Sequence, residues 1–135
     1  MKTTTIQQRI KFKGTRAAQL YRFYMDAALH AAITGYPAQI EAQAQRPFQL
    51  YGDYLSGHTL FLIPNQLIVQ SLKARNWRLE AQPSILILQF KEEEEHTELW
   101  LYQMNVPTAI AADFKKGWND WYWKVWKAYL KRQQE

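Results

Sequence analysis

The 135-residue chain contains no cysteine, which excludes disulfide bonds, thiol catalysis and cysteine-ligated metal sites. It also has no long apolar run. The longest run of large aliphatic residues is 85–88, far below the roughly 20 residues that span a bilayer. The first five residues lack the apolar segment of a secretory signal. We therefore predict no membrane span and a cytoplasmic location.

Residues that could catalyse a reaction or bind a metal are few. His30, His58 and His96 are the only histidines, and no two of them have the spacing of metal ligands. The five glycines form no phosphate-binding loop, and there is no nucleophile elbow or dinucleotide fingerprint. We therefore predict no catalytic residue, no metal and no cofactor. His30 is predicted to be partly buried and hydrogen-bonded to backbone, with a catalytic role as the alternative.

The chain carries a net charge of +5, but its basic residues are scattered. Because no nucleic-acid-binding motif accompanies them, we predict no nucleic-acid partner. The one dense run of charge is acidic, at residues 92–95. It is predicted to be the solvated tip of a hairpin, with a metal site or a site for a basic partner as the alternatives.

Apolar and aromatic residues are abundant. Hydrophobic residues make up 47% of the chain, and six Trp, eight Tyr and six Phe are among them. A chain of this length and composition builds one hydrophobic core. Residues 1–135 are therefore predicted to form a single domain.

The spacing of apolar residues and of turn residues predicts an α+β fold. A first strand is expected over 4–12, a helix capped by Thr15 and running to Met25, and a short helix over 27–33. Strands are then expected at 38–44, 47–51, 54–63, 66–75, 84–91 and 97–104. A long helix is expected from about 110 to 132, with one buried face formed by Phe114, Trp118, Trp121, Val125 and Tyr129. The element order is β-α-α-β6-α.

Several short segments occur in a characteristic order. They are residues 33–38 (ITGYPA), Ser56-Gly57, Leu62-Ile63-Pro64, residues 68–71 (IVQS), Asn76-Trp77, Val106-Pro107, residues 117–119 (GWN) and Tyr122-Trp123. In this order they resemble the activator-of-heat-shock-protein-90-ATPase family of the SRPBCC (START-like) superfamily. The resemblance implies a helix-grip fold, in which a curved antiparallel sheet wraps around the long C-terminal helix and an apolar cavity lies between them. Two positions depart from the family pattern: Leu72 replaces a usual Trp, and His58 replaces a common acidic residue.

Two surfaces are candidates for function. A non-catalytic module would bind a hydrophobic small molecule in the cavity or act as a chaperone-associated factor. The cavity candidates are His30, Phe48, Leu50, Gln70, Leu72, Leu99, Leu101, Trp118, Tyr122 and Val125. The alternatives are a polyketide-cyclase-like enzyme and a purely dimeric interaction protein whose cavity is filled by the aromatic residues.

The second surface is the outer face of the sheet. Because side chains alternate between the two faces of a strand, inward-facing leucines on the last two strands leave bulky apolar residues pointing outward. The residues concerned are Val69, Ile85, Ile87, Trp100 and Tyr102. Such an exposed apolar patch predicts a homodimer or a protein-partner interface.

Overall fold

The computed structural model describes residues 1–134. The chain begins with strand β1 (Thr3–Lys13) and the helices α1 (Ala17–Met25) and α2 (Ala27–Thr34). Six strands follow: β2 (Ala38–Gln39), β3 (Pro47–Leu50), β4 (Leu55–Ile63), β5 (Leu67–Ala74), β6 (Ser84–Glu92) and β7 (His96–Pro107). The chain ends in one long helix, divided into α3 (Thr108–Trp118), a π-helical turn η1 (Asn119–Trp123) and α4 (Lys124–Gln133).

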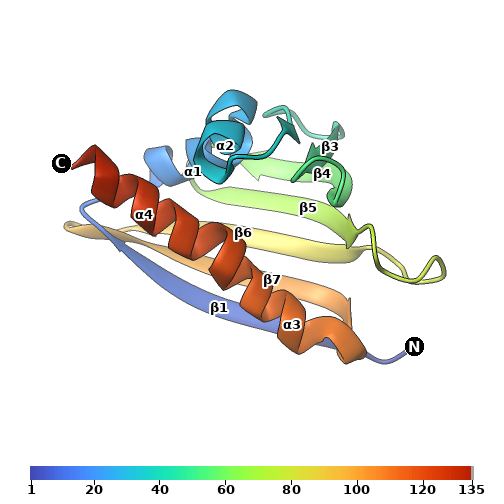
Figure 1. Ribbon diagram of the computed structural model, residues 1–135. Helices are drawn as coiled ribbons and strands as arrows, with labels where there is room; N and C mark the ends of the chain where they lie inside the picture. Colours follow the sequence, from blue (N-terminus) through green and yellow to red (C-terminus); the bar gives the residue numbers. More distant parts are fainter. Residues whose placement is uncertain (135) are drawn as a thin grey trace.

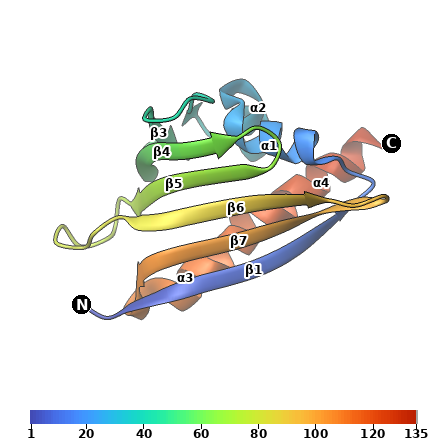
Figure 2. The ribbon, with the colours of Figure 1, turned by 180° about the vertical axis from the view of Figure 1, so that it is seen from behind.

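The strands form one antiparallel sheet in the order β1-β7-β6-β5-β4-β3-β2. Figure 1 shows the long C-terminal helix lying across one face of this sheet, with α1 and α2 beside its C-terminal half. Seen from behind, the strands β1, β7, β6 and β5 have no helix in front of them (Figure 2). The sheet therefore has an inner face that holds the helix and an outer face that does not.

The core lies between the inner sheet face and the helix. On β6 and β7 the buried positions alternate with half-buried ones, as a strand with two different faces requires. From the helix, Trp118, Tyr122, Trp123 and Trp126 are all at most 3% exposed and pack against this face. Large aromatic side chains bury roughly 150–250 Å² each, so these four supply much of the energy that holds helix to sheet.

The predicted buried face of the C-terminal helix is correct at Trp118 but wrong one turn later. Trp121 is 54% exposed, whereas its neighbours Tyr122 and Trp123 are buried. The cause is the π turn, in which the Lys124 N–H bonds to the Asn119 carbonyl five residues back. This turn holds more residues than an α-turn and rotates the rest of the helix relative to an ideal 3.6-residue repeat.

Two other predictions of local structure are wrong. The strand expected at 38–44 is only Ala38–Gln39, because residues 41–46 are all exposed and bury no face against the sheet. The cap of α1 is Arg16 rather than Thr15. The Thr15 hydroxyl donates instead to the Lys13 carbonyl oxygen at 2.9 Å, across the tight bend after β1.

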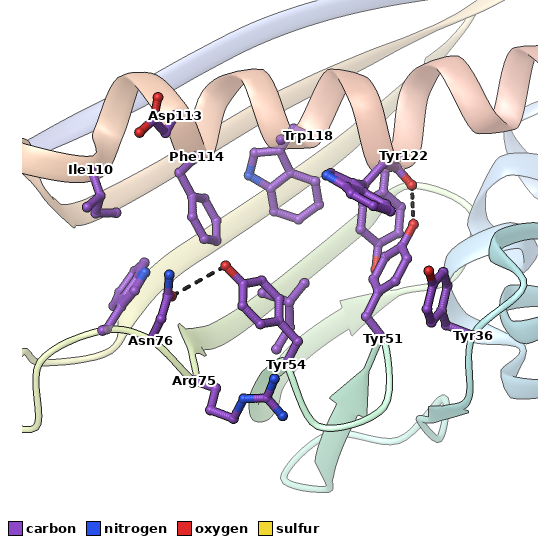
Figure 3. A pocket seen from close by; sticks show the side chains of 14 residues that line it. Tyr36, Tyr51, Tyr54, Arg75, Asn76, Ile110, Asp113, Phe114, Trp118 and Tyr122 are labelled. Atoms are coloured by element: carbon purple, nitrogen blue, oxygen red, sulfur yellow. Dashed lines mark hydrogen bonds between the residues drawn. The ribbon is translucent and has the colours of Figure 1, made fainter.

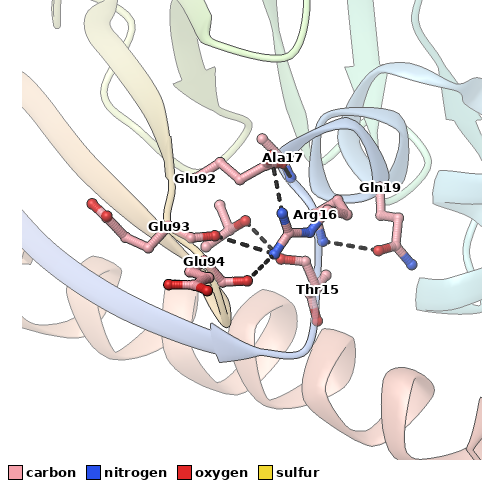
Figure 4. A network of polar contacts seen from close by, with 8 residues as sticks. Thr15, Arg16, Ala17, Gln19, Glu92, Glu93 and Glu94 are labelled. Carbon is pink, nitrogen blue, oxygen red and sulfur yellow. Dashed lines mark hydrogen bonds and ion pairs between the residues drawn. The ribbon is translucent and has the colours of Figure 1, made fainter.

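The acidic run at 92–95 is an exposed hairpin tip, but it also holds the start of α1 in place (Figure 4). The Glu92 carboxylate accepts from the Ala17 N–H at 2.8 Å and from the Arg16 guanidinium at 3.2 Å. Arg16 also donates to the carbonyl oxygens of Glu93 and Glu94. A carboxylate at a helix N-terminus satisfies a free backbone donor and interacts favourably with the helix dipole. The acidic run thus joins the β6–β7 hairpin to α1.

Candidate functional site

Most of the predicted cavity residues form the solid core instead of lining open space. Five of them from the sheet, Phe48, Leu50, Leu72, Leu99 and Leu101, are at most 2% exposed and belong to one cluster. Val125 is half-buried and packs against the edge of that cluster. The aromatic side chains of the helix pack in the middle of the space between helix and sheet.

His30 lies in this core and is held by both of its ring nitrogens. Its Nδ1 is 2.8 Å from the Tyr24 carbonyl oxygen, which can only accept, so Nδ1 carries the proton. Its Nε2 therefore accepts from the Tyr122 hydroxyl at 2.9 Å. Burial lowers the pKa of His30 to about 4, which keeps the ring neutral near pH 7. His30 thus joins α2 to the π turn of the long helix.

Gln70 is a second buried polar link. Its side-chain carbonyl accepts from the Tyr24 hydroxyl at 2.9 Å, and its amide donates to the Thr59 hydroxyl at 3.1 Å. Burial raises the pKa of Tyr24, so the hydroxyl remains a donor. The two polar residues among the predicted cavity candidates, His30 and Gln70, are therefore hydrogen-bonded to other buried groups.

An open cavity of about 480 Å³ lies at one end of the helix–sheet interface. Figure 3 shows it between the helix residues Ile110–Tyr122 on one side and the β3–β4 turn and the end of β5 on the other. Of the predicted set, Trp118 and Tyr122 line it. The remaining aromatic lining comes from Tyr36, Tyr51, Tyr54, Trp77, Phe114 and Trp121. The cavity is thus a slot whose walls are mainly aromatic rings.

One wall of the cavity is a tight turn tied to the π turn. Tyr51 and Gly52 both have positive φ, 53° and 69°, a conformation that costs energy for a bulky residue such as tyrosine. The Tyr51 hydroxyl donates to the backbone carbonyl oxygen of Trp121 in the π turn. Burial raises the pKa of Tyr51, so it remains protonated as this donor. π turns and non-glycine residues held at positive φ are both enriched at functional sites.

The mouth of the cavity has a few polar groups. Arg75 forms an ion pair with Asp53, and the Tyr54 hydroxyl donates to the Asn76 side-chain oxygen at 3.3 Å. Asp113, an exposed residue of the helix, lies at the rim of the cavity (Figure 3). The interior is therefore suited to a flat apolar molecule, and the rim offers hydrogen bonds to a polar substituent.

A family model described as "Activator of Hsp90 ATPase homolog 1-like protein" matches residues 14–131. The chain belongs to this family. A mouse protein named "Activator of 90 kDa heat shock protein ATPase homolog 2" is 28% identical over 116 residues. The match covers 86% of this chain and 35% of the mouse protein, so the chain spans about a third of the length of this relative.

Solved structures of similar shape confirm the predicted helix-grip fold. An HSP90 activator from Plasmodium falciparum superposes with a TM-score of 0.86 at 20% identity, over 94% of this chain and 96% of that one. CalU16 from Micromonospora echinospora superposes with a TM-score of 0.73 at 17% identity, over 87% and 68% of the two chains. At these identities the similarity concerns the fold alone.

In this member of the Hsp90-activator-like family, two residues of the motif segments line the cavity although they are not among the predicted cavity candidates. Tyr36 belongs to the segment 33–38, and Trp77 belongs to the Asn76-Trp77 pair. Both segments could therefore have been proposed as cavity walls. Tyr51 and Tyr54 flank a two-residue turn and belong to none of the motifs.

The five predicted interface residues lie together on the outer face of the sheet. Val69, Ile85, Ile87, Trp100 and Tyr102 are each half-buried and point away from the C-terminal helix.

Within residues 1–134, no cluster of His, Cys, Asp or Glu side chains is arranged to hold a metal ion. No helix of the described chain has the length and apolar character that crossing a bilayer requires.

Proposed function

We propose that this chain is a non-catalytic binding module that holds a flat, largely apolar molecule in the aromatic cavity between α3–η1 and the β3–β4 turn. The observation that carries the proposal is the cavity itself, because about 480 Å³ walled by eight aromatic side chains suits a small ring system. Aromatic rings favour stacked and edge-on contacts with other rings.

The polyketide-cyclase alternative is less well supported by the arrangement of titratable groups. A general acid–base mechanism needs a proton-transferring group within reach of the bound substrate. His30 has both ring nitrogens engaged in the core, and Arg75 at the mouth is paired with Asp53. Asp113, the one carboxylate of the lining, is exposed to solvent at the rim. The cavity therefore favours binding over proton transfer.

A glycine-to-leucine change in the cavity wall tests the proposal. Gly117 lines the cavity, and a Cβ added there would meet only the Trp121 ring at 4.0 Å, an ordinary contact. We expect Gly117→Leu to lower the affinity for the naphthalene probe 1-anilinonaphthalene-8-sulfonate at least tenfold, because the new side chain occupies the slot. Stability should be unchanged or higher, since leucine is the better helix former by about 0.8 kcal/mol. Probe fluorescence and thermal unfolding measure the two effects.

The matched control is Ala112→Leu, which places the same leucine side chain on the exposed side of the same helix. It should leave probe affinity unchanged. Native mass spectrometry of freshly purified protein provides an independent result, since a bound small molecule would be released on denaturation. If Gly117→Leu and wild type bind the probe equally and the purified chain is empty, the cavity is not the binding site.

The second candidate is a chaperone-associated factor, which the family membership and the name of the mouse relative favour. We expect purified 90-kDa heat-shock protein to retain this chain in a pull-down and to hydrolyse ATP faster in its presence. Gly117→Leu separates the two candidates, because a protein-binding role that does not use the cavity would be unaffected. The second candidate is removed if the heat-shock protein does not retain this chain and its ATPase rate does not change.

A further inference from the structure

The outer face of the sheet carries a row of apolar side chains that crosses four strands. Phe61 on β4 pairs with Val69 on β5, Val69 with Ile87 on β6, and Ile87 with Tyr102 on β7. Ile85 and Trp100 lie on either side of this row. These six residues are the outer patch. Phe61 is 52% exposed, and Figure 2 shows no helix in front of this face. An antiparallel sheet that faces water normally carries polar side chains here.

Basic groups surround one end of the outer patch. The Arg9 guanidinium lies 3.7 Å from the Trp100 ring centroid, and the Lys91 ammonium lies 4.5 Å from it. Lys11 is on β1 in register with Glu98, whose carboxylate accepts from the Trp100 indole N–H at 2.6 Å. Arg9, Lys11 and Lys91 outnumber the Glu98 carboxylate on this face of the sheet. That carboxylate lies 3.9 Å from the Arg9 guanidinium, and the acidic run 92–95 follows Lys91 at the hairpin tip. A protein partner that fits here has an apolar centre and carboxylates beside it.

The size of the outer patch favours a small partner over a second copy of this chain. Three strand spacings of about 4.8 Å give a width of ~14 Å. The four residue steps from Trp100 to Met104, the partner of Ile85, give a similar length. The resulting ~200 Å² is well below the ~800 Å² that each partner buries in a standard interface. Two copies would also bring together chains of net charge +5 and like-charged rims.

We propose that the outer patch docks a short acidic amphipathic helix of another protein. Its apolar face would lie on the row from Phe61 to Tyr102, and its carboxylates would lie near Arg9, Lys11 and Lys91. A helix of about 10 residues is ~15 Å long and matches the width of the outer patch. This docking is independent of the aromatic cavity, which lies on the other side of the sheet.

Fluorescence anisotropy tests the proposal with a defined probe. The probe is a fluorescein-labelled helical peptide of about 14 residues with leucines at i, i+3, i+4 and i+7 and glutamates beside them. A matched peptide carries lysines in place of the glutamates. We expect the glutamate peptide to bind wild type, to bind less tightly as salt is raised, and to bind at least ten times more tightly than the lysine peptide. Ile87→Glu should weaken the binding at least tenfold, whereas Gly117→Leu should leave it unchanged.

Phe61→Gln is the second variant, because this half-exposed side chain at the edge of the sheet can be replaced without opening the core. It should also weaken binding, and thermal unfolding checks that both variants are folded. The proposal is overturned if the glutamate peptide does not bind, or if it binds the variants as well as wild type. It is also overturned if size exclusion shows a dimer of this chain that Ile87→Glu converts to monomer, since a second copy would then cover the patch.

Discussion

Replacing Gly57 with alanine is expected to destabilise the fold by about 3 kcal/mol or more, because the backbone of the neighbouring strand occupies the space that a side chain would need. An added Cβ would lie 1.9 Å from the Ser71 carbonyl oxygen and 2.7 Å from its carbonyl carbon. Both are backbone atoms of β5, which is hydrogen-bonded to β4 on one side and β6 on the other. The clash is therefore relieved only if one of these strands moves.

Gly117→Ala is the matched control for this prediction. There the nearest atom to the added Cβ is 4.0 Å away, and the position is helical. Alanine should stabilise the protein by up to about 1 kcal/mol, since glycine is the poorer helix former. Urea unfolding of Gly57→Ala and Gly117→Ala compares the free energy of unfolding for one substitution at a site where the added Cβ clashes and at a site where it has room. A Gly57→Ala protein that unfolds within 1 kcal/mol of wild type would contradict the close approach of β4 and β5.

The central strands β6 and β7 could be predicted from sequence because each shows two different faces. Buried residues occur at every second position from Ser84 to Phe90 and from Thr97 to Gln103, and the predicted strands 84–91 and 97–104 differ from the observed ones only at their ends. Gly57 belongs to a segment that resembles the family pattern, but the sequence alone does not show why glycine is needed there. That reason is the closeness of Ser71, fourteen positions further along the chain, which only the pairing of β4 with β5 reveals.

The cavity was harder to predict than the sheet. A regular helical repeat from Phe114 places Trp121 in the core, but the π turn places it half outside, at the mouth of the cavity. A π turn has no simple sequence signature, because it forms where tertiary contacts, here the Tyr51 hydroxyl on the Trp121 carbonyl, compensate for a looser helix. The opposite wall comes from turn residues without any periodicity. The position of the open space thus depends on packing between distant segments.

His30 is expected to make the stability of the fold depend on pH between about 6.5 and 4. In the folded protein burial lowers its pKa to about 4, whereas a histidine in an unfolded chain has a pKa of about 6.5. As the pH falls below 6.5, the unfolded chain therefore takes up a proton that the folded chain does not. Unfolding becomes easier, and the two pKa values imply a loss of ~2 kcal/mol between pH 7 and pH 5.

The His30→Gln variant isolates this contribution. It should be less stable than wild type at pH 7, because the bonds to the Tyr24 carbonyl and the Tyr122 hydroxyl are disturbed. From pH 7 to pH 5, however, its free energy of unfolding should fall by ~2 kcal/mol less than that of wild type. His58→Gln, which replaces an exposed ring on β4, should follow wild type. Urea unfolding at pH 7 and at pH 5 gives the change in the free energy of unfolding for wild type and for the two variants. If wild type and His30→Gln lose equal stability, the ring of His30 is not held neutral by burial, and the link between α2 and the π turn would have to work with a charged imidazole.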